Sequence, residues 1–120
     1  MIDHMGINVS DMATSKRFYE AALKPLGYSV LMDFGDPAVG LGEDGKPDFW
    51  LGKGVPRPSH VAFRSRDRAT VDAFYAAAIA AGGRDNGAPG VRAQYHPGYY
   101  GAFVLDPDGY NIEAVCHQAP

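Results

Sequence analysis

The sequence predicts an α+β fold in which two tandem βαβββ modules form a cleft-lined mixed sheet. Three observations lead to this prediction. The chain of 120 residues contains an internal duplication. Each copy begins with strand-like alternation that gives way to helical spacing. Near the end, two apolar runs flank Asp-Pro-Asp-Gly, a turn sequence. The length indicates one domain, with module one at about residues 1–54 and module two at about 57–120.

The duplication relates residues 4–27 to residues 60–83. Aligned without gaps, the two segments agree at nine positions, where about one or two matches are expected by chance. The matched pairs are His4/His60, Asp11/Asp67, Ala13/Ala69, Thr14/Thr70, Phe18/Phe74, Tyr19/Tyr75, Ala21/Ala77, Ala22/Ala78 and Gly27/Gly83. Two copies of so long a unit indicate a paired-module domain.

Each copy opens with a strand followed by a helix. Along HMGINV and HVAFRS, apolar side chains alternate with a second set that contains the histidines. Asp11 and Asp67 are suitable N-caps, and Gly27 and Gly83 are suitable helix ends. The residues at apolar helical spacing are Phe18, Ala22 and Leu26, and then Val71, Phe74, Ala78 and Ala81. Each module therefore has an amphipathic helix that covers one face of its sheet.

Three further strands follow each helix. In module one we expect them at residues 28–34, about 38–42, and 48–52, separated by turn sequences. In module two we expect a weaker strand near 84–94, followed by strands at 100–105 and 110–117. The segment KGVPRP, residues 53–58, is a linker too short to separate two domains. The sequence does not fix the order of the strands.

Composition excludes several classes of partner. The net charge of −3 is spread along the chain, so no basic stripe indicates nucleic acid and no polybasic segment indicates anionic lipid. We expect no secretory peptide and no membrane span. The single Cys116 lies on the apolar side of its strand and is expected to pack as a small hydrophobe. A cytoplasmic protein is the expectation.

The cleft face carries a candidate metal-binding set. Alternation puts His4, Gly6 and Asn8, and then His60, Ala62 and Arg64, opposite the packed face. Glu113 joins them if the last strand lies beside the first strand of its module. Two neutral imidazoles and a carboxylate hold a divalent metal and leave positions open for substrate or water. Each histidine alone also fits a satisfied polar residue, and Glu113 alone fits a solvated one.

The segment QYHPGYYG, residues 94–101, is rich in groups that bind oxygenated or planar ligands. Its phenols and imidazole can serve as acid, base or hydrogen-bond donor, and the segment equally fits an aromatic loop packed over the sheet. Arg64 either pairs a substrate anion or covers the sheet rim with its aliphatic stem.

Three segments resemble the vicinal oxygen chelate superfamily of glyoxalase I, fosfomycin resistance, bleomycin resistance and extradiol dioxygenase proteins. They are HMGINVSDMATSKRFYEAAL, SHVAFRS and FVLDPDGYNIEAV, and the resemblance spans essentially the whole chain. It implies metal ligands from the first and last strands of each module, here His4, Trp50, His60 and Glu113. Trp50 departs from the pattern because glyoxalase I has a glutamate there and an indole cannot bind a metal. The other three residues are similar to the ligand set of fosfomycin resistance thiol transferases and to the His-His-Glu iron site of extradiol dioxygenases.

The resemblance implies a metal-dependent enzyme for a small-molecule substrate that binds through oxygen. Lyase, thiol transferase and dioxygenase chemistry are all consistent with it, and the metal would be Mn, Fe, Ni, Zn or Co. The candidate catalytic residues are Glu113, Tyr100 and His96, and the candidate substrate-binding residues are Trp50, Arg64, Asn8, Tyr95 and Tyr99. The alternative is a metal-free binding protein similar to the bleomycin resistance proteins, with an aromatic groove. We expect a homodimer, because exposed sheet edges favour pairing.

Overall fold

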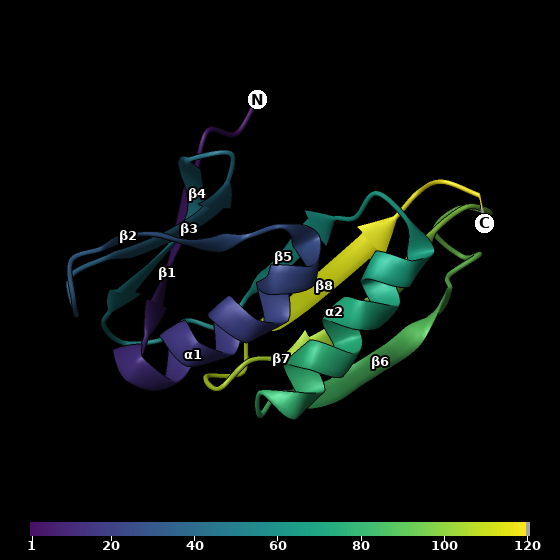
Figure 1. The fold of residues 1–120 in the computed structure, drawn as a ribbon. Helices are drawn as coiled ribbons and strands as arrows, with labels where there is room; N and C mark the ends of the chain where they lie inside the picture. Colours follow the sequence, from purple (N-terminus) through teal and green to yellow (C-terminus); the bar gives the residue numbers. More distant parts are fainter. Residues whose placement is uncertain (120) are drawn as a thin grey trace.

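The computed structural model describes residues 1–119 and contains the two predicted modules (Figure 1). Module one comprises β1 (Met5–Val9), α1 (Met12–Leu23), a short 3-10 turn (Lys24–Leu26), β2 (Ser29–Asp33), β3 (Val39–Glu43) and β4 (Lys46–Lys53). Module two comprises β5 (His60–Arg64), α2 (Arg68–Ala80), β6 (Arg84–Val91), β7 (Tyr100–Leu105) and β8 (Asn111–Cys116).

Each module forms its own four-stranded mixed sheet. The strand orders are β1-β4-β3-β2 and β5-β8-β7-β6, so the two sheets have the same topology. In each, the first strand pairs in parallel with the last, and the other pairings are antiparallel. The last strand of each module therefore lies beside its first strand, which is the condition for Glu113 to join the candidate site.

The two helices begin where their N-caps were predicted. Asp11 accepts a hydrogen bond from the amide of Thr14 at 3.0 Å, and Asp67 accepts one from the amide of Thr70 at 2.7 Å. These bonds satisfy amides that have no partner within the helix. Gly27 adopts φ +89°, a left-handed conformation that suits glycine and ends the first helical segment.

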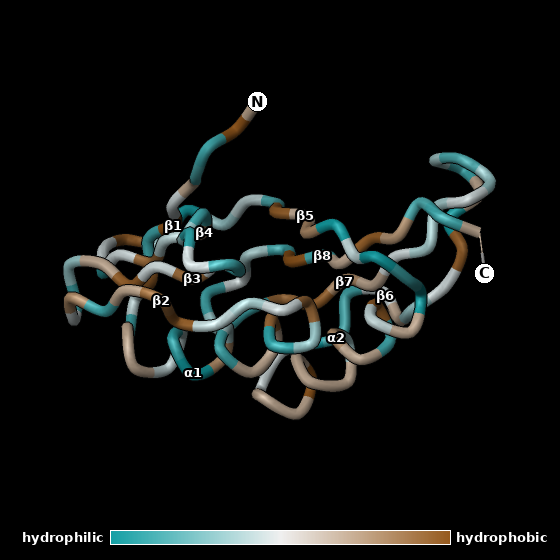
Figure 2. Tube along the Cα trace, turned by 45° about the horizontal axis from the view of Figure 1, so that its top comes forward, coloured by the Kyte–Doolittle hydropathy of each residue, from teal (hydrophilic) through white to brown (hydrophobic). Residues whose placement is uncertain are grey.

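Both helices lie on the same side of the strands (Figure 2), and α1 contacts α2. The packed faces follow the predicted alternation, since Ile7 and Val9 of β1 and Val61 and Phe63 of β5 are buried. The ring of Phe63 meets that of Phe49 edge-on, with centroids 5.2 Å apart. The modules therefore share an aromatic core beneath the sheets, and the opposite sheet faces have no helix over them.

The Asp-Pro-Asp-Gly turn forms as predicted and also joins the modules. The amide of Gly109 donates to the carbonyl of Asp106 at 3.0 Å, which closes the turn between β7 and β8. The buried Asp106 carboxylate accepts hydrogen bonds from the Tyr19 hydroxyl of α1 and from the amides of Asp108 and Tyr110. Burial raises the pKa of Asp106, and these donors offset part of that effect.

Most strand ends lie within one residue of their predicted positions, and the differences include the start of β4, the end of β6 and the end of α2. Strand β4 begins at Lys46, two residues early, because Pro47 is accommodated at a register shift opposite Gly42. Strand β6 ends at Val91, since the amide of Tyr95 turns back to the carbonyl of Arg92. After α2 the left-handed residue is Gly82, with φ +101°, and not Gly83.

No helix within residues 1–119 is long and apolar enough to cross a membrane.

Candidate functional site

The strand pairing of module two brings His60 and Glu113 together. In the parallel ladder of β5 and β8, His60 lies opposite Asn111 and Ala62 lies opposite Glu113. His60 and Glu113 are therefore diagonal neighbours on the face that carries no helix. The His60 Nε2 atom is 3.0 Å from Glu113 Oε1. This contact joins two of the three predicted metal ligands.

The two side chains differ in exposure. Glu113 is only 1% exposed, whereas the His60 side chain is 48% exposed. The His60 Nδ1 atom is 3.0 Å from the carbonyl oxygen of Asn111, so the ring donates its Nδ1 proton there. The Nε2 atom therefore faces a buried carboxylate oxygen. The second Glu113 oxygen, Oε2, accepts a hydrogen bond from the Tyr99 hydroxyl.

A hollow of about 490 Å³ opens over this pair. Its lining residues are His60, Tyr95, Tyr99, Phe103, Asn111 and Glu113. Two of the predicted substrate-binding residues, Tyr95 and Tyr99, are among them. Their rings meet edge-on with centroids 4.9 Å apart. The hollow thus has aromatic walls and an imidazole-carboxylate pair, a combination suited to a small ligand.

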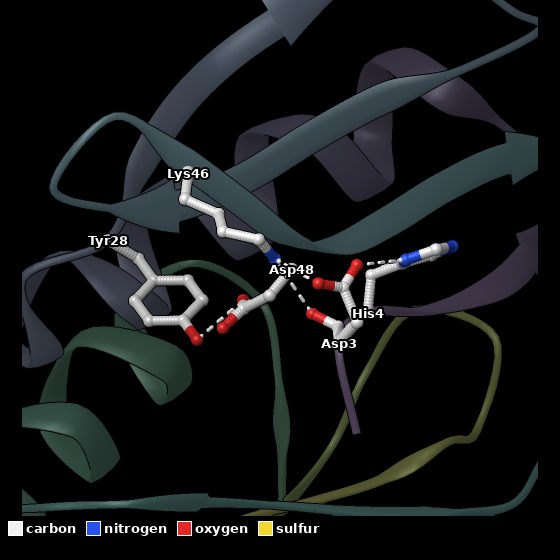
Figure 3. Close-up of polar contacts among 5 residues, drawn as sticks. All are labelled: Asp3, His4, Tyr28, Lys46 and Asp48. Atoms are coloured by element: carbon white, nitrogen blue, oxygen red, sulfur yellow. Dashed lines mark hydrogen bonds and ion pairs between the residues drawn. The ribbon is translucent and has the colours of Figure 1, made fainter. Parts of the chain in front are cut away.

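The third predicted ligand, His4, lies immediately before β1, the first strand of the other sheet. Its Nδ1 atom is 2.7 Å from Asp3 Oδ2, and Lys46 Nζ is 3.2 Å from Asp3 Oδ1 (Figure 3). The hydrogen bonds with His4 and then Lys46 lower the pKa of Asp3. With Nδ1 donating to this carboxylate, the Nε2 atom of His4 is left available as a metal ligand. The His4 side chain is 61% exposed.

Trp50 occupies in module one the place that Glu113 has in module two. Gly6 pairs with Trp50 in the parallel ladder of β1 and β4, and the duplication relates Gly6 to Ala62, the partner of Glu113. Trp50 and Asn8 both line a hollow of about 360 Å³ over this sheet. The indole lies against Gly40, where an added Cβ would be 2.8 Å from its ring. A bare backbone therefore makes room for the indole.

Within one chain the three predicted ligands do not converge. Among the described residues, no three His, Cys, Asp or Glu side chains lie close enough together to hold a metal ion. His60 and Glu113 meet on one sheet, while His4 contacts Asp3 on the other.

The structure corrects the placement of Tyr100. Strand alternation puts it on the face of Ala102 and Val104, which the helices cover, and its hydroxyl donates to Asp72 of α2 at 2.6 Å. The Arg68 guanidinium lies 4.9 Å from the Tyr100 ring centroid. Tyr100 therefore faces α2, and its neighbour Tyr99 is the phenol that reaches Glu113.

Arg64 and His96 also lie away from the His60-Glu113 pair. Arg64 lines a separate polar hollow of about 390 Å³ that includes Glu43 of module one and Arg66. His96 Nε2 is 2.7 Å from His117 Nδ1, and the two imidazoles stack with centroids 4.9 Å apart. His96 reaches the hollow only through Tyr99, whose ring it meets at 5.4 Å.

Sequence reasoning missed three residues of this region. Asn111 shares the alternation of Glu113 and could have been found from that pattern. Phe103 lies directly opposite Glu113 across β7 and β8, a pairing that the predicted hairpin contained without fixing its register. His117 has no sequence signal for its contact with His96, because the loop that carries His96 has no periodic pattern.

Comparisons with known proteins agree with this architecture. No protein-family model matches the sequence, and no curated protein matches it significantly. A solved glyoxalase/bleomycin resistance protein from Albidiferax ferrireducens T118 is 28% identical, covers 98% of each chain and has a TM-score of 0.81. A glyoxalase/bleomycin resistance protein/dioxygenase family enzyme from Burkholderia phytofirmans PsJN is 19% identical over 98% of each chain, with a TM-score of 0.73.

A lactoylglutathione lyase from Agrobacterium tumefaciens also has this fold. It is 16% identical, covers 97% of this chain and 92% of its own, and has a TM-score of 0.72. Such low identity shows the fold alone. Together these structures confirm the resemblance to the vicinal oxygen chelate superfamily and the glyoxalase/bleomycin resistance/dioxygenase fold predicted from the sequence.

Proposed function

We propose that the chain is a divalent-metal-dependent enzyme acting on a small molecule that binds through its oxygen atoms. The observation that carries this proposal is the contact between His60 Nε2 and Glu113 Oε1 at 3.0 Å. With Nδ1 at a carbonyl, His60 Nε2 and a carboxylate oxygen, two atoms able to donate an electron pair to a cation, face each other at the floor of a hollow. A cation shared by both donors stabilises this arrangement, and imidazole with carboxylate suits Mn, Fe, Ni, Zn or Co.

We propose that His4 of a second copy supplies the third ligand in a homodimer. His4 is exposed, its Nε2 is free, and the face of sheet β1-β4-β3-β2 that carries it has no helix over it. If this face of one copy meets the equivalent face of module two in its partner, the ligand set is complete. Such an interface would also cover both open sheet faces. In a dimer with twofold symmetry the same contact forms twice, so both copies of each face are covered.

A metal bound there would act as a Lewis acid that polarises a substrate oxygen and stabilises an enolate or alkoxide, or activates a nucleophile. Glu113 supplies a buried negative charge that offsets the charge of such a cation. The rings of Tyr95 and Phe103 provide flat apolar walls for the substrate. These features are compatible with lyase, thiol transferase and dioxygenase chemistry. We place the protein in the cytoplasm, where its buried free thiol, Cys116, stays reduced.

Metal content of protein purified without chelators tests this function. Wild type is expected to hold a divalent metal near stoichiometry, and Glu113→Gln and His60→Ala are expected to lose it while circular dichroism stays unchanged. The matched control is Glu20→Gln, an exposed carboxylate on α1 that should leave the metal content unaffected. Wild type that takes up none of the five metals would contradict the enzyme function.

The second candidate function is metal-free binding of small aromatic molecules, and Trp50 favours it. The indole stands at the position equivalent to Glu113 and lines a hollow of its own. Because Trp50 is the only tryptophan, its fluorescence reports on ligands in that hollow. Quenching by small aromatics that is the same with and without added metal would support this function.

A further inference from the structure

Each oxygen of the Glu113 carboxylate has a polar contact within the protein. Oε1 lies 3.0 Å from His60 Nε2, and Oε2 accepts a hydrogen bond from the Tyr99 hydroxyl. The side chain is 1% exposed, so bulk water does not provide alternative partners. A carboxylate that kept both oxygens free could rotate about its last bond and offer either one or both to a cation. In this protein Oε2 is already occupied by the hydrogen bond from the Tyr99 hydroxyl.

The Tyr99 side chain is itself fixed by its surroundings. Its amide donates to the carbonyl of His96 at 3.1 Å, and its carbonyl accepts from the amide of Arg92 at 2.7 Å. The ring meets those of Tyr95, His96 and His117 edge-on, at 4.9, 5.4 and 5.3 Å between centroids. The segment before β7 therefore positions the Tyr99 phenol beside Glu113 and restricts the movement of this side chain.

The two imidazoles beside Tyr99 form a definite hydrogen-bond chain. The amide of Gly98 donates to His96 Nδ1 at 3.0 Å, so His96 carries its proton on Nε2 and donates it to His117 Nδ1. This chain connects the loop that carries Tyr99 to the end of β8, the strand that carries Glu113. The donor and the acceptor of the Tyr99-Glu113 hydrogen bond are thus tied to one another at a second point.

Gly101 makes room for the Tyr99-Glu113 pair. A Cβ added at Gly101 would lie 3.1 Å from Glu113 Oε2 and 3.2 Å from Tyr99 Cε1. Both distances are shorter than ordinary van der Waals contact, so a side chain at this position would require the phenol or the carboxylate to shift by a few tenths of an ångström. The backbone of β7 is therefore shaped to accept this pair.

We propose that Tyr99 is a positioning residue that keeps Oε2 of Glu113 occupied, so that Glu113 offers only Oε1, beside Nε2 of His60, to a bound cation. This inference rests on the proposed metal-dependent function and deepens it. A phenol carries its proton at neutral pH, so the Tyr99 hydroxyl donates to Oε2 of Glu113. Partners of this kind, which orient a ligand without touching the metal, strongly influence metal affinity.

Binding of Co²⁺ to Tyr99→Phe tests the proposal, because this change removes only the hydroxyl. Affinity is expected to fall by about 10- to 100-fold, and the visible absorption of bound Co²⁺ should shift as the carboxylate changes its coordination. The matched control is Tyr95→Phe, which lies in the same hollow but does not bond to Glu113. Gly101→Ala should act in the same direction as Tyr99→Phe. Unchanged affinity and an unchanged Co²⁺ spectrum in Tyr99→Phe would overturn the proposal.

A crystal structure of metal-free Tyr99→Phe separates this proposal from the proposed function. The Glu113 carboxylate is expected to rotate away from its contact with His60 Nε2 once Oε2 has lost its donor. A carboxylate that still lies 3.0 Å from His60, as in the wild type, would overturn the positioning role. Wild type that binds none of the five metals would overturn the metal-dependent function, and this structure would still decide whether Tyr99 positions Glu113.

Discussion

The two modules have the same sheet topology and the same register between first and last strands, yet their open faces carry different chemistry. Module two places the buried Glu113 carboxylate beside His60 under a hollow lined with aromatic rings. Module one places the Trp50 indole at the equivalent position and leaves His4 exposed beside Asp3. The duplicated backbone thus fixes where a side chain stands, and the residue at each position decides what it can bind.

The difference between the modules extends to the glycines around each position. In module one, Gly40 leaves space for an indole. In module two, Gly101 leaves space for a phenol bonded to a carboxylate. Both glycines belong to the third strand of their module, next to the last strand. A close backbone approach on this strand is therefore a feature that the modules share, and each uses it to seat a different side chain.

The largest expected effect comes from making the modules alike. Trp50→Glu places a carboxylate at the position equivalent to Glu113 and restores the fourth ligand implied by the resemblance to glyoxalase I. Divalent-metal affinity is expected to rise by about tenfold, since another anionic oxygen donor would face the cation in the proposed dimer. Competition with a chromophoric chelator measures it, with Trp50→Gln as the uncharged control. Equal affinity in the two variants would mean that Trp50 stands away from the metal.

A smaller effect is expected from closing the space beside the indole. Gly40→Ala puts a methyl group 2.8 Å from the Trp50 ring, so the indole must move toward water, at a cost of about 1 kcal/mol in stability. The emission of this single tryptophan should shift to longer wavelength. Gly6→Ala is the matched control, because its Cβ would meet Trp50 at 3.6 and 3.7 Å, which is ordinary contact. Identical emission spectra in the two variants would argue against this packing.

The smallest effect concerns the helix caps, a feature in which the modules agree. Asp11→Ala and Asp67→Ala should each lower the thermal unfolding midpoint by a few degrees at neutral pH, because helix amides lose their acceptor. Hydrogen bonds from Thr70 lower the pKa of Asp67 below its ordinary value of 3.8. The stabilisation of the folded state by the Asp67 carboxylate is therefore complete above pH 3.8 and is lost as the pH falls through the lowered pKa.

Thermal scans of wild type and Asp67→Ala across this pH range measure that loss. The difference between the two midpoints should narrow as Asp67 becomes protonated. A difference that stays constant down to strongly acid pH would show that the carboxylate charge has no part in the cap.

Strand alternation predicted the open face correctly because a period of two leaves no choice once the packed face is known. It put His60 and Glu113 on the face opposite the packed side chains. The parallel pairing of β5 and β8 brings the two residues into contact there. The rule was not applied to Tyr99 and Tyr100, which follow an irregular loop and were predicted together as part of a ligand-binding segment. Without a known register, adjacent residues exchange faces, and the prediction assigned the catalytic role to the phenol that faces α2.

Other features depend on tertiary contacts that no local pattern encodes. The sequence could not reveal strand order, because each sheet pairs its first strand with its last, and these strands are far apart along the chain. It also could not show that His4 stays apart from His60 and Glu113 within one chain. Strand β4 begins before the predicted residue 48, because Pro47 is accepted at a register shift.

The central claim is that His60 and Glu113 form half of a metal site that His4 of a second copy completes. Subunit complementation between His4→Ala and His60→Ala tests it most directly. Each variant alone is expected to bind no metal at near-stoichiometric level. Mixed dimers, refolded together and isolated by two different tags, should bind one metal per dimer, since His4 of one copy meets the intact pair of the other. Mixed dimers that bind no more metal than the single variants would contradict the shared site.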